Sequence, residues 1–159
     1  MRLERGVPVL IAVDFSDGSI AAFEWALDFA EAVVAPLLVL HVAHDPPDDP
    51  GSYAGRGETR PIEEVARERL DAFLEAQLAK PAAPECSDLR KEVVVGLPVN
   101  RILEVAEREG VQAIVIGAKG RTALADVLLG SKAERVVHLS PVPVVVAKTA
   151  HRTSSPEER

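Results

Sequence analysis

The sequence predicts an α/β fold in which an open, five-stranded parallel sheet carries helices on both faces. Five short runs rich in valine, isoleucine and leucine lie along the 159 residues, and longer segments with helical periodicity separate them. The apolar runs do not alternate with polar residues, so we expect strands that are buried on both faces, as in a parallel sheet. The regular alternation of strand and helix then places helices on both sides of that sheet.

Each element follows from a local pattern. The strands are expected over residues 7–13, 37–42, 93–95, 113–116 and 142–147. Apolar residues spaced three and four apart predict helices over residues 19–34 and 61–78. Pro98 suits the first turn of a third helix, Gly110 suits its end, and a fourth helix begins near Ser131. The inward stripe of the first helix is expected to consist of Ile20, Phe23, Leu27, Ala30 and Val34.

We expect one domain over residues 1–150 and a polar, flexible tail over residues 151–159. Residues 45–60 form one long irregular connection with three prolines and three glycines. A connection of this length is either a flap over a site or an inert surface loop.

Composition excludes several classes of function. The chain carries 18 lysines and arginines against 25 aspartates and glutamates, a net charge of −7. Binding to nucleic acid or to an anionic membrane depends mainly on a basic surface, so we expect neither partner. No apolar stretch approaches the roughly 20 residues that cross a bilayer, and the first residues do not show the pattern of a secretion signal, so we expect neither a membrane span nor secretion. The one cysteine, Cys86, cannot form an internal disulfide, which favours a free thiol in the cytoplasm.

The segment after the fourth strand carries the clearest functional signal. Gly117 and Gly120 allow the backbone to approach a ligand, and Gly130 and Ser131 stand at a helix N-terminus, where free N–H groups favour an anion. Residues 117–135 hold four cations and two anions, a local charge of +2: Lys119, Arg121, Lys132 and Arg135 against Asp126 and Glu134. These features predict a phosphate site. Two structural alternatives stay open, namely ordinary turn glycines and a capping box between Ser131 and Glu134.

The spacing Gly117-x2-Gly120-x9-Gly130-Ser131 resembles the nucleotide-binding pattern of the universal stress protein family. The likeness spans nearly the whole chain and includes residues 13–16, 40–42, 128–131, 134–136 and 140–144. It implies a Rossmann-like, adenine-nucleotide-binding fold with strand order 3-2-1-4-5. It also implies a protein that binds ATP and forms a homodimer.

The resemblance implies roles for individual residues. Asp14 would lie by the ribose or by a phosphate-bound Mg²⁺, although it also suits a turn before the first helix, and backbone near Val42 would face adenine. Lys132 stands where the family often has an apolar residue, and it either pairs with phosphate or points into solvent. Ala133 stands where the family often has a residue with a hydroxyl group. The full set assigned to the nucleotide is Ala12, Val13, Asp14, Val42, Ile116, Gly117, Gly120, Arg121, Gly130, Ser131, Lys132 and Ala133.

The last strand predicts assembly. In that strand order it lies at an edge of the sheet, and an exposed apolar edge favours pairing with another chain. A partner related by a two-fold axis packs against this edge in the family, and such contacts are the commonest oligomeric solution. The residues expected at the dimer interface are Val142, Val144, Val145 and Val146.

No catalytic constellation stands out, so we expect a protein that is not an enzyme. The histidines, His41, His44, His138 and His151, are scattered along the chain, and we interpret His41 as a residue of the core. The leading hypothesis is an ATP-binding, stress-response regulatory protein that acts through its nucleotide-dependent state and its dimer or partner contacts. The alternatives are a nucleotide-free dimeric interaction module of the same fold and a slow Mg²⁺-dependent ATPase.

Overall fold

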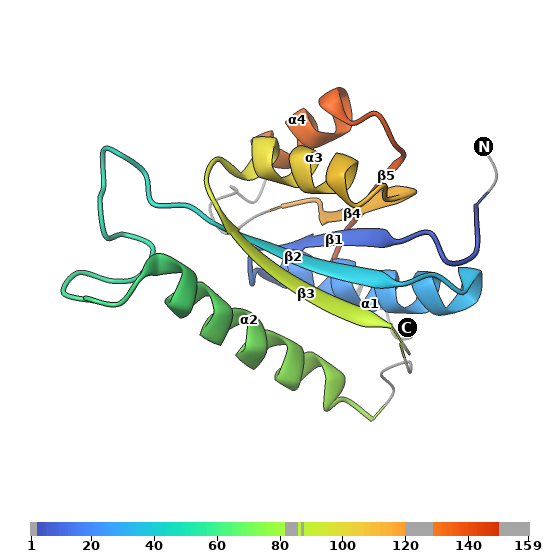
Figure 1. Cartoon of the computed structure of the whole chain (residues 1–159), viewed down its shortest axis with the longest axis horizontal. Coiled ribbons are helices and arrows are strands. Elements are labelled where there is room, and N and C mark those ends of the chain that lie inside the picture. The colour runs from blue at the N-terminus through green and yellow to red at the C-terminus, as the bar shows by residue number, and fades with distance from the viewer. Residues whose placement is uncertain (1–2, 82–85, 87, 120–128, 150–159) are drawn as a thin grey trace, which may run out of the picture.

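The computed structural model describes residues 3–81, 86, 88–119 and 129–149, and within them five parallel strands form one sheet in the order β3-β2-β1-β4-β5. The strands are β1 (Val9–Val13), β2 (Leu37–Ala43), β3 (Leu89–Val95), β4 (Ala113–Gly117) and β5 (Val144–Ala147). The helices are α1 (Asp17–Val33), α2 (Ile62–Leu78), α3 (Pro98–Arg108) and α4 (Ser131–Leu139). Figure 1 shows α1 and α2 on one face of the sheet and α3 and α4 on the other. The predicted fold class and strand order are confirmed.

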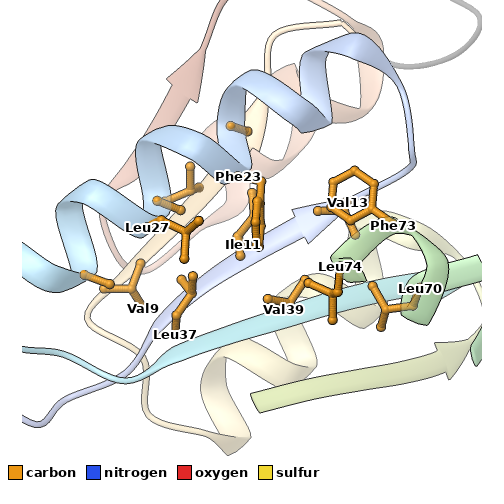
Figure 2. Close-up of a cluster of buried hydrophobic side chains, with 14 of the residues drawn as sticks. Val9, Ile11, Val13, Phe23, Leu27, Leu37, Val39, Leu70, Phe73 and Leu74 are labelled. Atoms are coloured by element: carbon orange, nitrogen blue, oxygen red, sulfur yellow. The ribbon is translucent and has the colours of Figure 1, made fainter. Parts of the chain in front are cut away.

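The central strands explain the apolar runs of the sequence. β1 pairs with β2 on one side and with β4 on the other, so that Val9 lies opposite both Leu37 and Ala113. Side chains of these strands alternate between two layers of the core. One layer lies under α1 and α2, where Phe23, fully buried, packs among strand valines and leucines (Figure 2). The other layer lies under α3 and α4 and includes Leu10 and Ile114.

Strand β3 differs from the prediction, because it begins at Leu89 rather than at residue 93. Its first half carries Arg90, Lys91 and Glu92, whose charges hide a strand from a search for apolar runs. The strand lies at an edge of the sheet, where these side chains pair in solvent with neighbouring helices: Arg90 with Glu109, Lys91 with Asp71, and Glu92 with Arg108. The expectation of strands buried on both faces is therefore wrong for β3.

Three further boundaries move inward. β1 begins after Pro8 and β5 begins after Pro143, since proline has no N–H group to donate to a neighbouring strand. Helix α1 ends at Val33, and Val34 adopts a left-handed conformation with a side chain that is 58% exposed. Val33, rather than Val34, packs against the core at the end of α1, so the placement of Val34 in the inward stripe is wrong.

The helix signals read from the sequence are otherwise confirmed. α3 has Pro98 in its first turn, and Gly110, with a positive φ of 60°, follows its end. Among the described residues, no helix combines the length and apolar character that crossing a bilayer requires. The expected tail, residues 151–159, lies outside the described residues.

Candidate functional site

The candidate site lies at the carboxyl ends of β1 and β4, where the chain order of the sheet reverses and ligands of open α/β sheets bind. Two helices begin there. The Gly130 N–H, just before α4, donates to the Ala118 carbonyl at 2.7 Å. The Ser16 hydroxyl oxygen, just before α1, lies 3.4 Å from the Lys119 carbonyl oxygen. The segment after β4 is thus bound to the starts of both helices.

Asp14 is held in place directly after β1. Its Oδ1 accepts hydrogen bonds from the Ser16 backbone N–H at 3.1 Å, the Ser16 hydroxyl at 2.5 Å and the Ser19 hydroxyl at 2.6 Å. The Asp14 N–H in turn donates to the Ser19 hydroxyl at 2.8 Å. The N-cap of α1 is Ser16, whose hydroxyl accepts from the Ser19 N–H, and not Asp14. Asp14 therefore presents a carboxylate of fixed orientation at the site.

Two glycines allow the end of β4 to touch the first turn of α1. A Cβ on Gly117 would lie 2.6 Å from the backbone carbon of Gly18, and a Cβ on Gly18 would lie 2.5 Å from the Lys119 carbonyl oxygen. Neither glycine has a positive φ, so each is required for space rather than for its conformation. The packing of the protein itself therefore explains the glycine at position 117.

No side-chain hydrogen bond caps the start of α4 in the part of the chain that the structure describes. Gly130 is the N-cap, in an extended conformation. The capping box between Ser131 and Glu134 is therefore wrong, because the helix begins one residue earlier than that motif requires and Ser131 is its first residue rather than its N-cap. Free N–H groups at a helix start carry a partial positive charge and attract anions. Ser131 and Lys132 are exposed there, whereas Ala133 is buried in the core.

The predicted wall residues divide between the two faces of the sheet. Ala12, Val42 and Ile116 pack with Ala133 in the layer under α3 and α4. Val13 points the opposite way, into the layer under α1 and α2, because successive strand residues alternate. Of the remaining predicted residues, Gly120 and Arg121 lie outside the described residues.

Sequence reasoning missed a group of aromatic residues beside Asp14. Phe15 has a positive φ of 66°, and its ring centroid lies 4.2 Å from that of His41. His41 is 4% exposed, as expected for a core residue, with Nδ1 2.7 Å from the Val13 carbonyl and Nε2 2.6 Å from the Tyr53 hydroxyl. Tyr53 belongs to the 45–60 loop, so this loop reaches the site. In the sequence, His41 lies within an apolar strand, and nothing in the neighbouring residues indicates that Tyr53 contacts it.

Asp45 organises the start of the same loop. Its carboxylate accepts hydrogen bonds from the Gly51 N–H at 2.6 Å, the Tyr53 N–H at 3.2 Å and the Ser52 hydroxyl at 3.3 Å. These bonds, those of Gly51 and Tyr53 above all, lower the pKa of Asp45 below its ordinary value. The guanidinium of Arg69, on α2, lies 4.8 Å from the Tyr53 ring centroid. The loop is thus fixed by Asp45 at its start and contacts α2 through Arg69.

The described residues include no group of three or more His, Cys, Asp or Glu side chains placed to hold a metal ion. The carboxylate of Asp14 is the described group that we consider for a metal ion at the site. This donor set fits a Mg²⁺ ion that takes most of its oxygens from bound phosphates, since Mg²⁺ commonly uses one or two carboxylates plus substrate oxygens.

The predicted interface strand is half-buried. Val144 and Val146 pack with the layer under α3 and α4, and Val145 packs with the layer under α1 and α2. β4 is the partner of β5 among the described strands. The outer edge of β5 therefore lies at the border of the described sheet, with Val142 half-buried just before it.

Known proteins share this architecture. The model of the universal stress protein family matches residues 8–148. A universal stress protein of Methanocaldococcus jannaschii is 32% identical over 143 residues, which cover 88% of this chain and 81% of the relative. The solved structure of UspA from Lactobacillus plantarum is 26% identical, has a TM-score of 0.71, and matches over 90% of this chain and 98% of its own. A universal stress protein solved in complex with cAMP is also 26% identical, with a TM-score of 0.61 over 92% of this chain and 100% of that one.

Proposed function

The chain belongs to the universal stress protein family, and from that membership we propose that it is an ATP-binding regulatory protein of the stress response. It acts through its nucleotide-dependent state and through contacts with a second copy or another partner, rather than as an enzyme. The observation that carries this proposal is the start of α4, which no described side chain caps, together with the anchored carboxylate of Asp14 at the same edge of the sheet. The relative solved with cAMP supports an adenine nucleotide as the ligand.

Each end of the nucleotide has a matching group in the described residues. The N–H groups at the start of α4 and the Ser131 hydroxyl suit phosphate oxygens, and the exposed Lys132 adds a positive charge. Asp14 suits a ribose hydroxyl or a phosphate-bound Mg²⁺, which would neutralise phosphate charge. Backbone at Val42 suits the adenine edge. Ala133 is buried and lacks a hydroxyl, so the helix N–H groups contribute more of the phosphate binding than in relatives with Ser or Thr there.

The proposal extends to compartment and assembly. Cys86, the one cysteine in the sequence, is a free thiol, which supports a reducing cytoplasm. The half-buried valines of β5 support a homodimer built through that strand.

Calorimetric titration with ATP, AMP and cAMP tests the proposed function. We expect wild-type protein to bind at least one of them, and Gly130→Val to weaken binding by roughly tenfold or more, about 1.4 kcal/mol, because a side chain there obstructs the start of α4. The backbone of Gly130 has a negative φ of −67°, which valine adopts, so the fold should survive. Failure of the wild-type protein to bind any of these nucleotides would contradict the proposal and favour the nucleotide-free module.

A charge-matched pair of variants locates the phosphates. Lys132→Glu should weaken ATP binding more than AMP binding, because the change places a negative charge at the start of α4. Lys148→Glu changes the net charge equally at an exposed position after β5 and should leave affinity nearly unaltered. A slow ATPase would instead show turnover that Asp14→Ala abolishes while binding persists.

A further inference from the structure

A chain of contacts joins the 45–60 loop to Asp14. The Tyr53 hydroxyl lies 2.6 Å from His41 Nε2, and His41 Nδ1 lies 2.7 Å from the Val13 carbonyl oxygen. Val13 is the residue immediately before Asp14. A residue in the middle of the loop is thus connected through one imidazole ring to the backbone that carries the candidate ligand carboxylate.

The Val13 carbonyl fixes the direction of one of these hydrogen bonds, and the protonation state of His41 fixes the direction of the other. A backbone carbonyl only accepts, so His41 Nδ1 carries the proton and donates to Val13. In the neutral ring Nε2 is then an acceptor, and the Tyr53 hydroxyl donates to it. His41 is 4% exposed, and a buried polar group left without a partner costs about 1–3 kcal/mol. Loss of the Tyr53 hydroxyl therefore removes a hydrogen bond from a buried ring.

His41 also supports the residue on the other side of Asp14. The Phe15 ring centroid lies 4.2 Å from that of His41 and 5.6 Å from that of Phe73. The positive φ of Phe15, 66°, costs on the order of 1–3 kcal/mol for a residue other than glycine, and such a conformation persists only where packing enforces it. The imidazole of His41 thus contacts the residues that precede and follow Asp14.

The position of Tyr53 is set from the loop side as well. The Asp45 carboxylate accepts from the Tyr53 N–H, and the Arg69 guanidinium lies over the ring. These contacts leave the hydroxyl directed at His41. Tyr53 is therefore held by contacts with Asp45 and Arg69 in the position from which its hydroxyl contacts His41.

We infer that Tyr53 and His41 are positioning residues for the nucleotide site, and that they couple the 45–60 loop to Asp14. The ligand in this inference rests on the proposed function. Coupling of this kind is reciprocal: if the Tyr53 contact strengthens nucleotide binding, bound nucleotide must stabilise the ordered loop by the same factor.

Tyr53→Phe tests the coupling, because it keeps the ring that Arg69 covers and removes the hydroxyl alone. Arg56 provides the readout: its side chain is 88% exposed in the loop, and trypsin cleaves after it, whereas Arg60 is protected by Pro61. In wild-type protein, ATP should slow cleavage at Arg56. In Tyr53→Phe, cleavage should be faster without nucleotide, ATP should no longer slow it, and the calorimetric Kd for ATP should rise roughly three- to tenfold.

Ser52→Ala is the matched control. It removes a 3.3 Å contact between the loop and Asp45 but leaves the Tyr53 hydroxyl in place, so the Kd and the ATP protection should stay close to those of the wild type. Equal affinity and equal ATP protection in Tyr53→Phe and wild-type protein would overturn the coupling while the proposed function stands. No binding by wild-type protein would contradict the proposed function, and the coupling with it.

Discussion

At the scale of single residues, steric space at the candidate site determines which side chains are tolerated. Gly18 lies in the first turn of α1, where alanine would normally stabilise a helix by about 1 kcal/mol. A Cβ there would lie 2.5 Å from the Lys119 carbonyl oxygen, which belongs to the backbone and cannot rotate away. The steric penalty of such overpacking, typically 1–3 kcal/mol, exceeds the helix preference.

We therefore expect Gly18→Ala to lower the free energy of unfolding by about 1–2 kcal/mol, measured by urea denaturation. Asp28→Ala, on the exposed side of the same helix, should change it by no more than about 0.5 kcal/mol. A Gly18→Ala variant more stable than the wild type would show that the segment after β4 yields to the new methyl group. Nucleotide affinity measured on the same protein separates this packing role from any contact with ligand.

At the scale of elements, the end of α1 holds an unfavourable residue. Val34 has φ 53° and ψ 54°, and its N–H donates to the Ala30 and Glu31 carbonyls. This left-handed conformation ends many helices and is normally filled by glycine, because a β-branched side chain crowds the backbone there. The side chain of Val34 is 58% exposed and contributes little packing in return.

Val34→Gly should accordingly raise the free energy of unfolding by about 0.5–1 kcal/mol. Relief of about 1–2 kcal/mol of left-handed strain outweighs the extra flexibility that glycine gives the unfolded chain, about 0.5–1 kcal/mol. Val34→Ala keeps a Cβ in the same conformation and serves as the control, with little gain expected. Thermal and urea unfolding of the wild type and the two variants measure the difference in the free energy of unfolding. Equal stability of the glycine and alanine variants would contradict the proposed backbone strain at Val34.

At the scale of the whole molecule, the proposed homodimer joins two sheets through β5. A two-fold axis perpendicular to the sheet pairs the strand with its own copy in antiparallel fashion, so one residue faces itself. Facing residues of antiparallel strands have Cα atoms about 4.5–5.5 Å apart, within the range that a disulfide spans.

In a Cys86→Ser background, cysteine substituted in turn at Val144, Val145 and Val146 should yield one variant that forms a cross-linked dimer on oxidation. Leu97→Cys, 58% exposed at the start of α3, controls for random collision. Equal cross-linking of all four variants, or none at any β5 position, would contradict this interface.

Each copy carries a net charge of −7, so added salt should also strengthen association by screening the repulsion between copies.

The fold was predictable because its signals are local. Apolar runs marked β1, β2 and β4, and the pair Pro98 and Gly110 marked both limits of α3. The first half of β3 was not predictable in this way, since Arg90, Lys91 and Glu92 read as a surface segment until the strand is known to lie at an edge. The capping box failed for a related reason, because a shift of one residue at the helix start changes which side chain can cap.

The sequence by itself determined the alternation of strand and helix, the family, and the segments that carry the candidate site, because periodicity and motif spacing are properties of neighbouring residues. Only the tertiary structure decided why Gly117 is glycine, which face each wall residue takes, and that Tyr53 meets His41. Those contacts join residues that are far apart in the chain, as Gly18 and Lys119 are. They depend on how loops and strand ends come together in space, which no local pattern specifies.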